Sequence, residues 1–418
     1  MTSSSSSPNL TPAKGPGFAE FVCLIAIMMA LNALAIDAML PALPAIGADL
    51  GVANENTRQW VITAYLLGFG GAQLAYGPLA DRYGRKPILM LGVGLYVLFS
   101  VVAAFSHSFT LLILARIGMG IGVASTRVLA VSIVRDRYEG RTMARVMSLS
   151  FLVFLGVPIL APTVGQVVLL FGPWQWIFWV FAVFGASFLT WAMIRLPETL
   201  HPEDRRSIEL RPILQAFGQA LTNRQAMGYT LAMTCVIGGL FGFINSSQQI
   251  FFDIFRAEHL FTTVFALVAG GIAVASLLNS HLVERLGSRM ISHAALLGFI
   301  LFSLIHAAVA LAGLDTIWTF SILQGCKMFC FGLVAGNFGS MAMEPMGHIA
   351  GTASSVQGFI STITGALLGF GIGQAFNGTT VPLTLGFALL SSLALVVVLW
   401  AERGHLFRSR HQPPVAKA

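Results

Sequence analysis

The stretch Gly77-Pro-Leu-Ala-Asp81-Arg82-Tyr-Gly84-Arg85-Lys86 decides the fold of this chain. It is a short charged segment between two long apolar runs. A similar segment, Ser280-His-Leu-Val-Glu284-Arg285-Leu-Gly287-Ser-Arg289, occurs much later in the chain. In both segments an acid, an arginine, a glycine and a final cation occupy equivalent positions. A long-range repeat of this kind predicts two parallel halves that are built on the same plan.

The composition of the chain excludes an ordinary soluble protein. Of its 418 residues 56% are hydrophobic and only 10% are charged, and the mean hydropathy is +0.80. Soluble domains carry about 25% charged residues. A soluble chain of this composition would have to expose large apolar patches, so we expect lipid to surround much of its surface.

The apolar runs predict twelve membrane spans, because a membrane helix needs roughly 20 apolar residues. The predicted spans cover residues 18–43, 58–79, 87–106, 109–133, 142–170, 174–195, 224–250, 260–283, 288–312, 316–342, 349–375 and 380–401. Spans of this length predict an all-α membrane protein, a helical bundle and not a barrel.

The longest polar interval divides these spans six and six. We therefore predict an N-terminal bundle over residues 18–195, a cytoplasmic linker over 196–223 and a C-terminal bundle over 224–401. The Ser- and Pro-rich residues 1–17 are predicted to be a disordered cytoplasmic tail, not a cleavable signal peptide. Residues 402–418 are predicted to be a second cytoplasmic tail.

The basic residues orient the predicted bundle. With both termini in the cytoplasm, nineteen of the 24 Lys and Arg lie in cytoplasmic loops, tails or helix ends. Only Arg58 and Arg256 fall on the other side, and Arg116, Arg127 and Lys327 lie within spans. This positive-inside pattern predicts a multi-pass protein of the bacterial inner membrane. It also accounts for the net charge of +7 without a nucleic-acid partner.

The segment from Gly77 to Lys86 resembles the signature loop of the major facilitator superfamily, whose fold is two pseudo-symmetric six-helix bundles. The resemblance implies that Asp81 sits at the start of the span over 349–375, and that Arg85 pairs with Asp136. Such contacts would latch the outward-open state. The alternative is a basic loop that serves only to set topology. The residues assigned to this conformational latch are Gly77, Asp81, Arg82, Gly84, Arg85, Lys86 and Asp136.

Further matches extend the resemblance along the chain. Leu34-Ala-Ile-Asp37-Ala-Met-Leu-Pro41-Ala-Leu-Pro44 is similar to the first helix of the bicyclomycin-resistance (Bcr/CflA) drug:proton antiporters. Arg116-Ile-Gly-Met-Gly120 resembles the Arg-x-x-Gln-Gly motif of the superfamily, with Met119 in place of the glutamine. Pro158-Ile-Leu-Ala-Pro162-Thr-Val-Gly165 resembles the antiporter motif, and Leu196-Pro-Glu-Thr-Leu200 is also found in that group. Pro158, Pro162 and Gly165 would form a kink that seals the interface between the halves.

Asp37 is the acidic residue that lies well inside a predicted span. An ionisable group in the bilayer is costly, which makes it a candidate for function. We expect Asp37 to carry the coupled proton, and the resemblance ties Arg116 to the same task. Two alternatives stay open: Asp37 is a structural partner of Arg116, or it lies at the outer end of its helix.

Polar residues within the apolar runs predict a mostly apolar substrate cavity with a few polar groups. Each of them alone is more often a contact between helices. Lys327 could contact substrate or act as a second titrating group. The predicted cavity residues are Asn32, Tyr65, Gln73, Arg127, Asn245, Gln248, Lys327, Asn337 and Gln357.

The sequence lacks the motifs of nucleotide-binding and metal-binding sites. No phosphate-binding Gly-x-x-x-x-Gly-Lys loop is present, so ATP hydrolysis is unsupported, and a proton gradient would replace any cofactor. The four cysteines show no metal-ligand spacing and are predicted to be buried thiols. No metal site is predicted.

The function that the resemblance implies is proton-coupled export of small lipophilic antibiotics. Its partners would be drug, protons and the lipid bilayer, and the chain would act as a monomer. The main alternative is a proton symporter that imports a sugar, an organic acid or an amino acid. A membrane-embedded enzyme or a channel is a remote alternative, since neither catalytic motifs nor paired intramembrane acids occur.

Overall fold

The computed structural model describes residues 15–205 and 210–407. The predicted tails therefore lie mostly outside the described residues, as do residues 206–209 of the predicted linker. The described chain is helical almost throughout.

The helices fall into two groups along the chain. The first group is α1 (Phe18–Asp37), α2 (Leu43–Asp49), α3 (Trp60–Tyr83), α4 (Arg85–Ala104), α5 (Phe109–Arg137), α6 (Gly140–Phe171) and α7 (Gln175–Arg195). The second is α8 (Leu210–Thr222), α9 (Arg224–Gln249), α10 (Glu258–Leu286), α11 (Ser288–Leu311), α12 (Ile317–Met343), α13 (Ala350–Gln374) and α14 (Val381–Ala401). Short helices join them: η1 (Leu40–Ala42), η2 (Glu55–Gln59), η3 (Pro202–Asp204), the π-helix η4 (Ile250–Ile254) and η5 (Glu344–Ile349).

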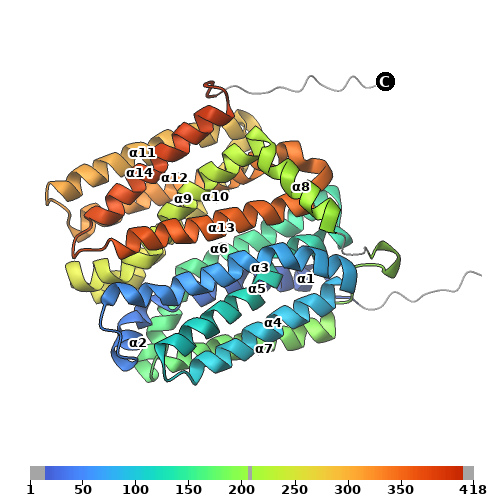
Figure 1. Cartoon of the computed structure of the whole chain (residues 1–418), viewed down its shortest axis with the longest axis horizontal. Helices are drawn as coiled ribbons and strands as arrows, with labels where there is room; N and C mark the ends of the chain where they lie inside the picture. The colour runs from blue at the N-terminus through green and yellow to red at the C-terminus, as the bar shows by residue number, and fades with distance from the viewer. Residues whose placement is uncertain (1–14, 206–209, 408–418) are drawn as a thin grey trace, which may run out of the picture.

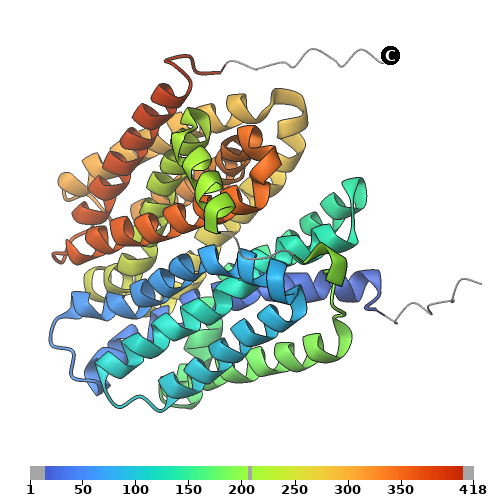
Figure 2. The ribbon, with the colours of Figure 1, turned by 45° about the vertical axis from the view of Figure 1, so that its right-hand side comes forward.

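The two groups lie side by side with their long helices roughly along one direction (Figure 1, Figure 2). Helices α1 to α7 form the blue-to-green half, and α9 to α14 form the yellow-to-red half. The start of α1 and helix α8 lie at the right in Figure 1, and α14 ends at the top of the picture. The end of α14 belongs to the same end of the bundle, because Arg224, which follows α8, donates to the carbonyl of Ala401. We call this the linker end. The opposite end, where α2 and η2 lie, is the far end.

Eleven helical stretches of the described chain are long and apolar enough to cross a membrane, judged by length and composition. Helix α3 is not among them, although it has 24 residues. Its lower apolarity fits its position, because α3 packs against α5 on one side and against α13 of the other half. The prediction of an all-α membrane protein with about twelve spans is confirmed.

Large apolar side chains cover the outer faces of the bundle. Leu170, Ile194, Leu267 and Leu389 are each at least 70% exposed. A soluble protein would rarely present so many of them, whereas lipid accepts them without cost.

Two details differ from the sequence predictions. The first span does not stop near residue 43, because the helical path continues through η1 and α2 to Asp49. The four cysteines are free, but they are not all buried: Cys23 is exposed and Cys326 is partly exposed. A membrane-facing thiol meets no polar solvent, so apolar flanks in the sequence do not distinguish a core cysteine from a lipid-facing one.

Candidate functional site

The loop between α3 and α4 forms an ion-pair cluster at the linker end. Gly84 has φ +104°, a conformation that side chains rarely adopt, and it directly precedes α4. The buried Arg85 that follows pairs with Asp136 at the end of α5, with 3.0 Å between Nε and Oδ2, and also with Asp81. The structure thus brings together Arg85 and Asp136, the pair that the family resemblance implied.

Glu198 completes this cluster, and the sequence analysis assigned it no role. Its carboxylate accepts hydrogen bonds from the backbone N–H of Arg85 (2.9 Å) and of Lys86 (3.1 Å). These are the first residues of α4, where the helix dipole favours an anion. The available signal was the segment from Leu196 to Leu200, which contains Glu198.

Helices α3 and α13 run antiparallel across the interface between the halves. The Gln73 amide Nε2 donates to Thr362 Oγ1 at 3.3 Å. One turn further toward the linker end, a Cβ on Gly77 would lie 3.8 Å from Ser355 Oγ. Gln73 and Gly77 therefore both lie at the interface between α3 and α13.

This register places Asp81 level with Gly351, near the first turn of α13. The side chain of Asp81 is 44% exposed and binds Arg85 of its own half. Among the described hydrogen bonds, none joins Asp81 to α13. Arg82 is exposed beside it. The parts of the predicted latch are thus adjacent, while the bond across the halves is not formed in this structure.

Arg116 of α5 is fully buried within the N-terminal half. Its Nε donates to the carbonyl of Val61 at 2.7 Å, and its guanidinium stacks 4.4 Å from the centre of the Tyr65 ring. The Tyr65 hydroxyl donates to Asn32 Oδ1 of α1 at 3.0 Å. Gly120 permits this arrangement, because a Cβ there would collide with the backbone carbonyl of Tyr65.

Asp37 is the last residue of α1, but it does not lie at the outer surface. The helix breaks there because Pro41 has no N–H to donate to the carbonyl of Asp37. The chain continues as a membrane-crossing stretch to Asp49, and Asp37 is only 6% exposed. Asp37 therefore lies at the end of α1 and is covered by the surrounding protein.

Asp37 and Arg116 are not direct partners. Within the described part of the chain, no ion pair joins them, and both terminal guanidinium nitrogens of Arg116 lack a hydrogen-bond partner. Tyr65 lies within electrostatic range of both groups. The connection from Arg116 to α1 therefore runs through Tyr65, and a direct Asp37–Arg116 pair does not form in this structure.

The antiporter-like segment of α6 packs against the break in α1. Pro158 and Pro162 lie inside the continuous helix α6. A Cβ on Gly165 would collide with the carbonyl oxygen of Ala38, the residue after Asp37. The same helix reaches the other half, since Gln166 Oε1 accepts from Thr262 Oγ1 of α10 at 3.0 Å.

Uncharged side chains join the two halves at the far end. The buried amide of Gln59 donates to Gln249 Oε1 (2.7 Å) and to the carbonyl of Gly373 (3.0 Å). Gln249 in turn donates to Asn56 Oδ1 (2.7 Å), and Gln374 donates to the carbonyl of Asn56 (2.7 Å). We call these four amide residues, Asn56, Gln59, Gln249 and Gln374, the far-end gate. The far-end gate is not apparent from the sequence, because amides near helix ends carry no distinctive spacing.

Two further predicted cavity residues lie near this gate. Asn245 is buried and lies 3.5 Å from the hydroxyl of Thr63 in the opposite half. Gln248 is also buried, and its amide nitrogen has no partner among the described residues. Arg127, in contrast, is exposed on α5.

The remaining predicted cavity residues lie within the C-terminal half. Asn337 donates to Asn279 of α10 at 2.7 Å, which is a contact between neighbouring helices. Gln357 lines a small pocket at the linker end between α8, α9, α12 and α13. Lys327 is fully buried, with Nζ 3.9 Å from the centre of the Phe387 ring of α14. The structure does not bring these three to the interface set around Gln73 and Asn245.

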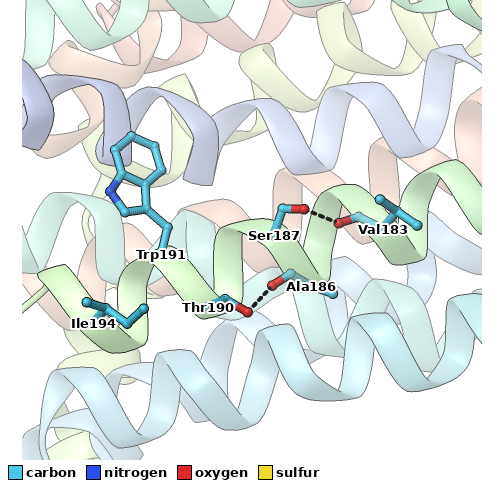
Figure 3. Close-up of a pocket in the computed structure, with 6 residues that line it drawn as sticks. All are labelled: Val183, Ala186, Ser187, Thr190, Trp191 and Ile194. Atoms are coloured by element: carbon cyan, nitrogen blue, oxygen red, sulfur yellow. Dashed lines mark hydrogen bonds between the residues drawn. The ribbon is translucent and has the colours of Figure 1, made fainter.

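A depression on the outer face of α7 is unsuited to a polar substrate (Figure 3). Ser187 and Thr190 bond the carbonyls of Val183 and Ala186 one turn earlier, at 2.7 and 2.9 Å, so both hydroxyls are satisfied within the helix. The depression is lined by Val183, Ala186, Ser187, Thr190, Trp191 and Ile194.

A two-part bundle of membrane-length helices with buried charged residues is the architecture expected of a membrane transporter. The chain belongs to the Major Facilitator Superfamily, whose family model matches residues 25–370. This is a family of transporters and not of enzymes.

Curated relatives match most of the chain. It is 30% identical over 351 residues to the MFS-type transporter YdgK of Bacillus subtilis, covering 82% of this chain and 86% of that protein. It is 28% identical over 376 residues to a bicyclomycin resistance protein homolog of Haemophilus influenzae (89% and 94% covered). It is 28% identical over 385 residues to the multidrug resistance protein MdtL of Shigella dysenteriae (92% and 95% covered).

Solved structures share the fold. The xylose transporter XylE from E. coli, in a partially occluded inward-open conformation, superposes with a TM-score of 0.73 at 12% identity, covering 94% of this chain and 99% of that one. The human organic anion transporter MFSD10 superposes with a TM-score of 0.69 at 18% identity, covering 92% and 100%.

Proposed function

We propose that this chain exports small lipophilic drugs from a bacterial cell in exchange for protons, by alternating access of its two halves. The observation that carries the proposal is Asp37, a buried carboxyl at the break in α1. The antiporter-like α6 packs directly on this break through Gly165. Relatives named for bicyclomycin resistance and multidrug resistance support the export of drugs.

Asp37 is the proposed carrier of the proton. A buried carboxylate without a paired cation is costly, so binding a proton removes an unfavourable charge from the membrane interior. Tyr65 lies within electrostatic range of Asp37 and stacks on Arg116. A change of charge at Asp37 would therefore change the electrostatic energy of both Tyr65 and Arg116. Proton binding at α1 would thereby alter the packing of α1 on α3 and α5.

The proposed substrate site lies between the halves. Its polar groups would be Asn32, Tyr65 and Gln73 from the N-terminal half and Asn245 and Gln248 from the C-terminal half. Arg127 would line the path toward the linker end. The drug would enter from the linker end while the far-end gate is closed, and leave at the far end once that gate opens.

The proposed latch holds the linker end closed in the other state. The buried pair Arg85–Asp136 keeps the ends of α4 and α5 together. Asp81, already level with the start of α13, would then bond to N–H groups of the first turn of α13, where the helix dipole favours an anion. The cytoplasmic position of this end follows from the positive-inside pattern and belongs to the same proposal.

A drug-susceptibility panel in a pump-deficient bacterium tests the proposal. Expression of the chain should raise the inhibitory concentration of bicyclomycin, and an uncoupler should abolish the gain. The Asp37→Asn variant at equal expression is the control. If outside-acid gradients instead drive accumulation of a sugar, organic acid or amino acid in right-side-out vesicles, the chain is an importing symporter and the export proposal fails.

A further inference from the structure

The C-terminal half contains a buried basic residue that the proposed mechanism does not use. Lys327 of α12 is fully buried, and its Nζ has no hydrogen-bond partner among the described residues. Gln324, one turn earlier on the same helix, is equally buried, and both of its amide atoms lack a partner. Buried polar atoms are almost always paired, so a group of orphaned ones needs a chemical reason.

A histidine and an aspartate lie in the same region. His306 of α11 is fully buried, and its Nε2 is 3.3 Å from Oδ2 of Asp315. Asp315 connects α11 to α12 at the far end and accepts bonds from Thr380 (2.6 Å) and Thr319 (3.2 Å). Burial raises the pKa of Asp315, but the adjacent His306 and the hydrogen bonds from Thr380 and Thr319 outweigh burial and hold this pKa below its ordinary value. We therefore take Asp315 to be ionised, with a negative charge, at neutral pH.

The three groups act on one another electrostatically. Lys327 lies within range of Asp315, and His306 lies within range of both. On α12 itself, the titratable side chains beside Lys327 are the thiols of Cys326 and Cys330. Helix α10, which packs against α11 and α12, carries its ionisable residues in its first turn (Glu258, His259) and in its last two turns (His281, Glu284, Arg285). Helix α14, which contributes the Phe387 ring, has no ionisable residue along its length. Asp315 is thus the counter-charge for two bases.

Charge balance limits this set to one proton. With Asp315 ionised, protonating one base gives a neutral cluster, whereas protonating both leaves a net positive charge in the membrane interior. The bases are on different helices, α11 and α12, which pack against each other. The proton therefore has two positions, one at mid-depth on α12 and one beside the far end.

We propose that Lys327, His306 and Asp315 form a proton-exchange site of the C-terminal half, in which the amine and the imidazole share one proton. The proposal deepens the proposed proton coupling and rests on it for its purpose. An N–H bond of Lys327 breaks as an N–H bond of His306 forms, and Asp315 stays ionised throughout. Asp315 places one side of the site at the far end. The site would therefore serve as a second proton-binding position, in addition to Asp37.

Nuclear magnetic resonance of the full chain in detergent micelles tests the sharing directly. The sequence holds only four lysines, Lys14, Lys86, Lys327 and Lys417, so side-chain-labelled lysine gives a short spectrum that Lys327→Met assigns. His306→Gln assigns the imidazole. We expect the Lys327 and His306 signals to shift together over a common interval between about pH 5 and 9.

Two variants separate proton exchange from a structural role. Lys327→Arg keeps a permanent cation against Asp315, so His306 should stay neutral over the whole interval. Lys327→Met removes the competitor, so His306 should take up the proton alone. A Lys327 signal that never moves, or a His306 titration that is identical in all three proteins, overturns the proposal.

The experiment is independent of the export proposal, because it needs neither drug nor gradient. A coupled titration in the parent protein, together with no drug resistance when that parent protein is expressed, would overturn the drug-export proposal alone. If Lys327→Met does not give a monodisperse protein, the Lys327→Arg spectrum still decides the question. A His306 titration unchanged in Lys327→Arg contradicts the sharing.

Discussion

Glycines determine how closely the helices approach around the buried charges of the N-terminal half. Gly120 brings α5 against the backbone of Tyr65, which places the Arg116 guanidinium on the Tyr65 ring. Gly165 brings α6 against the carbonyl of Ala38, beside Asp37. In a membrane, close approach through small residues replaces the hydrophobic effect as the force that joins helices. Single methyl groups at these positions should therefore matter.

The substitution Gly165→Ala tests this contact. The added Cβ would collide with backbone atoms, which move little, so we expect a loss of about 1–3 kcal/mol in stability and weaker drug resistance. Gly156→Ala is a matched control on the same helix, because no atom lies within 4 Å of its Cβ position. Both variants gain the same helix propensity, so the difference in unfolding temperature isolates the collision. Equal unfolding temperatures would contradict the contact.

Sequence reasoning identified most charged residues of the site but not all of their partners. The ion pair of Arg85 with Asp136 followed from the family motif, and it forms. The direct link from Arg116 to Asp37 does not form, because the rotation of α3 places the Tyr65 ring against the guanidinium. Rotations of this kind depend on packing of the whole half and leave no trace in residue spacing.

At the scale of helices, the end of α14 is tied to α9 and α11 by one carboxylate. Glu402 Oε1 accepts bonds from the Tyr229 hydroxyl (2.7 Å) and from Arg289 Nε (2.9 Å). Burial raises the pKa of Glu402, but these bonds outweigh burial and hold the pKa below its ordinary value of 4.5. A folded-state pKa below the unfolded one means that Glu402 stabilises the fold most when it is ionised.

The pH dependence of unfolding tests this tie. The contribution of Glu402 should be complete at neutral pH and should be lost as the pH falls below 4.5 toward its lower folded-state pKa. Glu402→Gln should therefore unfold at a lower temperature than the parent at neutral pH. The gap between the two should narrow in acid. A gap that is independent of pH would contradict an ionised Glu402.

The far-end gate is made of amides, so its strength should come from hydrogen bonds and not from charge. Gln59→Leu keeps the approximate size but removes the bonds to Gln249 and Gly373. At about 1 kcal/mol for each of the two bonds, we expect the far end to open roughly thirty-fold more often. The rate of maleimide labelling at a buried reporter, Thr63→Cys in a cysteine-free background, measures this opening.

A matched glutamine serves as the control for the gate. Gln175 also lies at the far end, but it bonds Asp49 within its own half at 3.1 Å. Gln175→Leu should leave the labelling rate of the reporter unchanged. Equal acceleration by both variants would mean that general loosening, and not the gate, controls access.

The helices themselves were more predictable than their contacts. All twelve predicted spans fall on long helices, because apolar runs of membrane length are a strong signal. The extension of the first span to Asp49 was missed, since Pro41 and Pro44 resemble a helix end in sequence. Here they only change the helix type, through η1 into α2.

At the scale of the whole molecule, the sequence repeat recurs as a structural repeat. Gly84 and Gly287, with φ of +104° and +78°, each precede a long helix. Arg85 binds two acids in the first half, and Arg289 binds Glu344 and Glu402 in the second. The register differs by one residue, because Arg289 aligns with Lys86 in sequence. Glu284, which aligns with Asp81, is exposed.

The charge asymmetry between the two ends predicts the orientation in the membrane. Fluorescent protein fused after residue 418 should fluoresce in a bacterial host, since it folds only in the cytoplasm in that setting. Alkaline phosphatase inserted in the far-end loop at residues 377–379 should be active, since it requires the periplasm. The reverse pair of results would invert the proposed topology and the direction of transport.

The most direct test of the whole account is proton-driven transport of labelled bicyclomycin in inverted membrane vesicles. With an inside-acid gradient, vesicles with the parent protein should accumulate the drug. Vesicles with Asp37→Asn should lose gradient-driven uptake by at least about ten-fold while keeping gradient-independent exchange of bound drug. Gradient-driven accumulation by Asp37→Asn at the parent rate would contradict the assignment of Asp37 as the proton carrier.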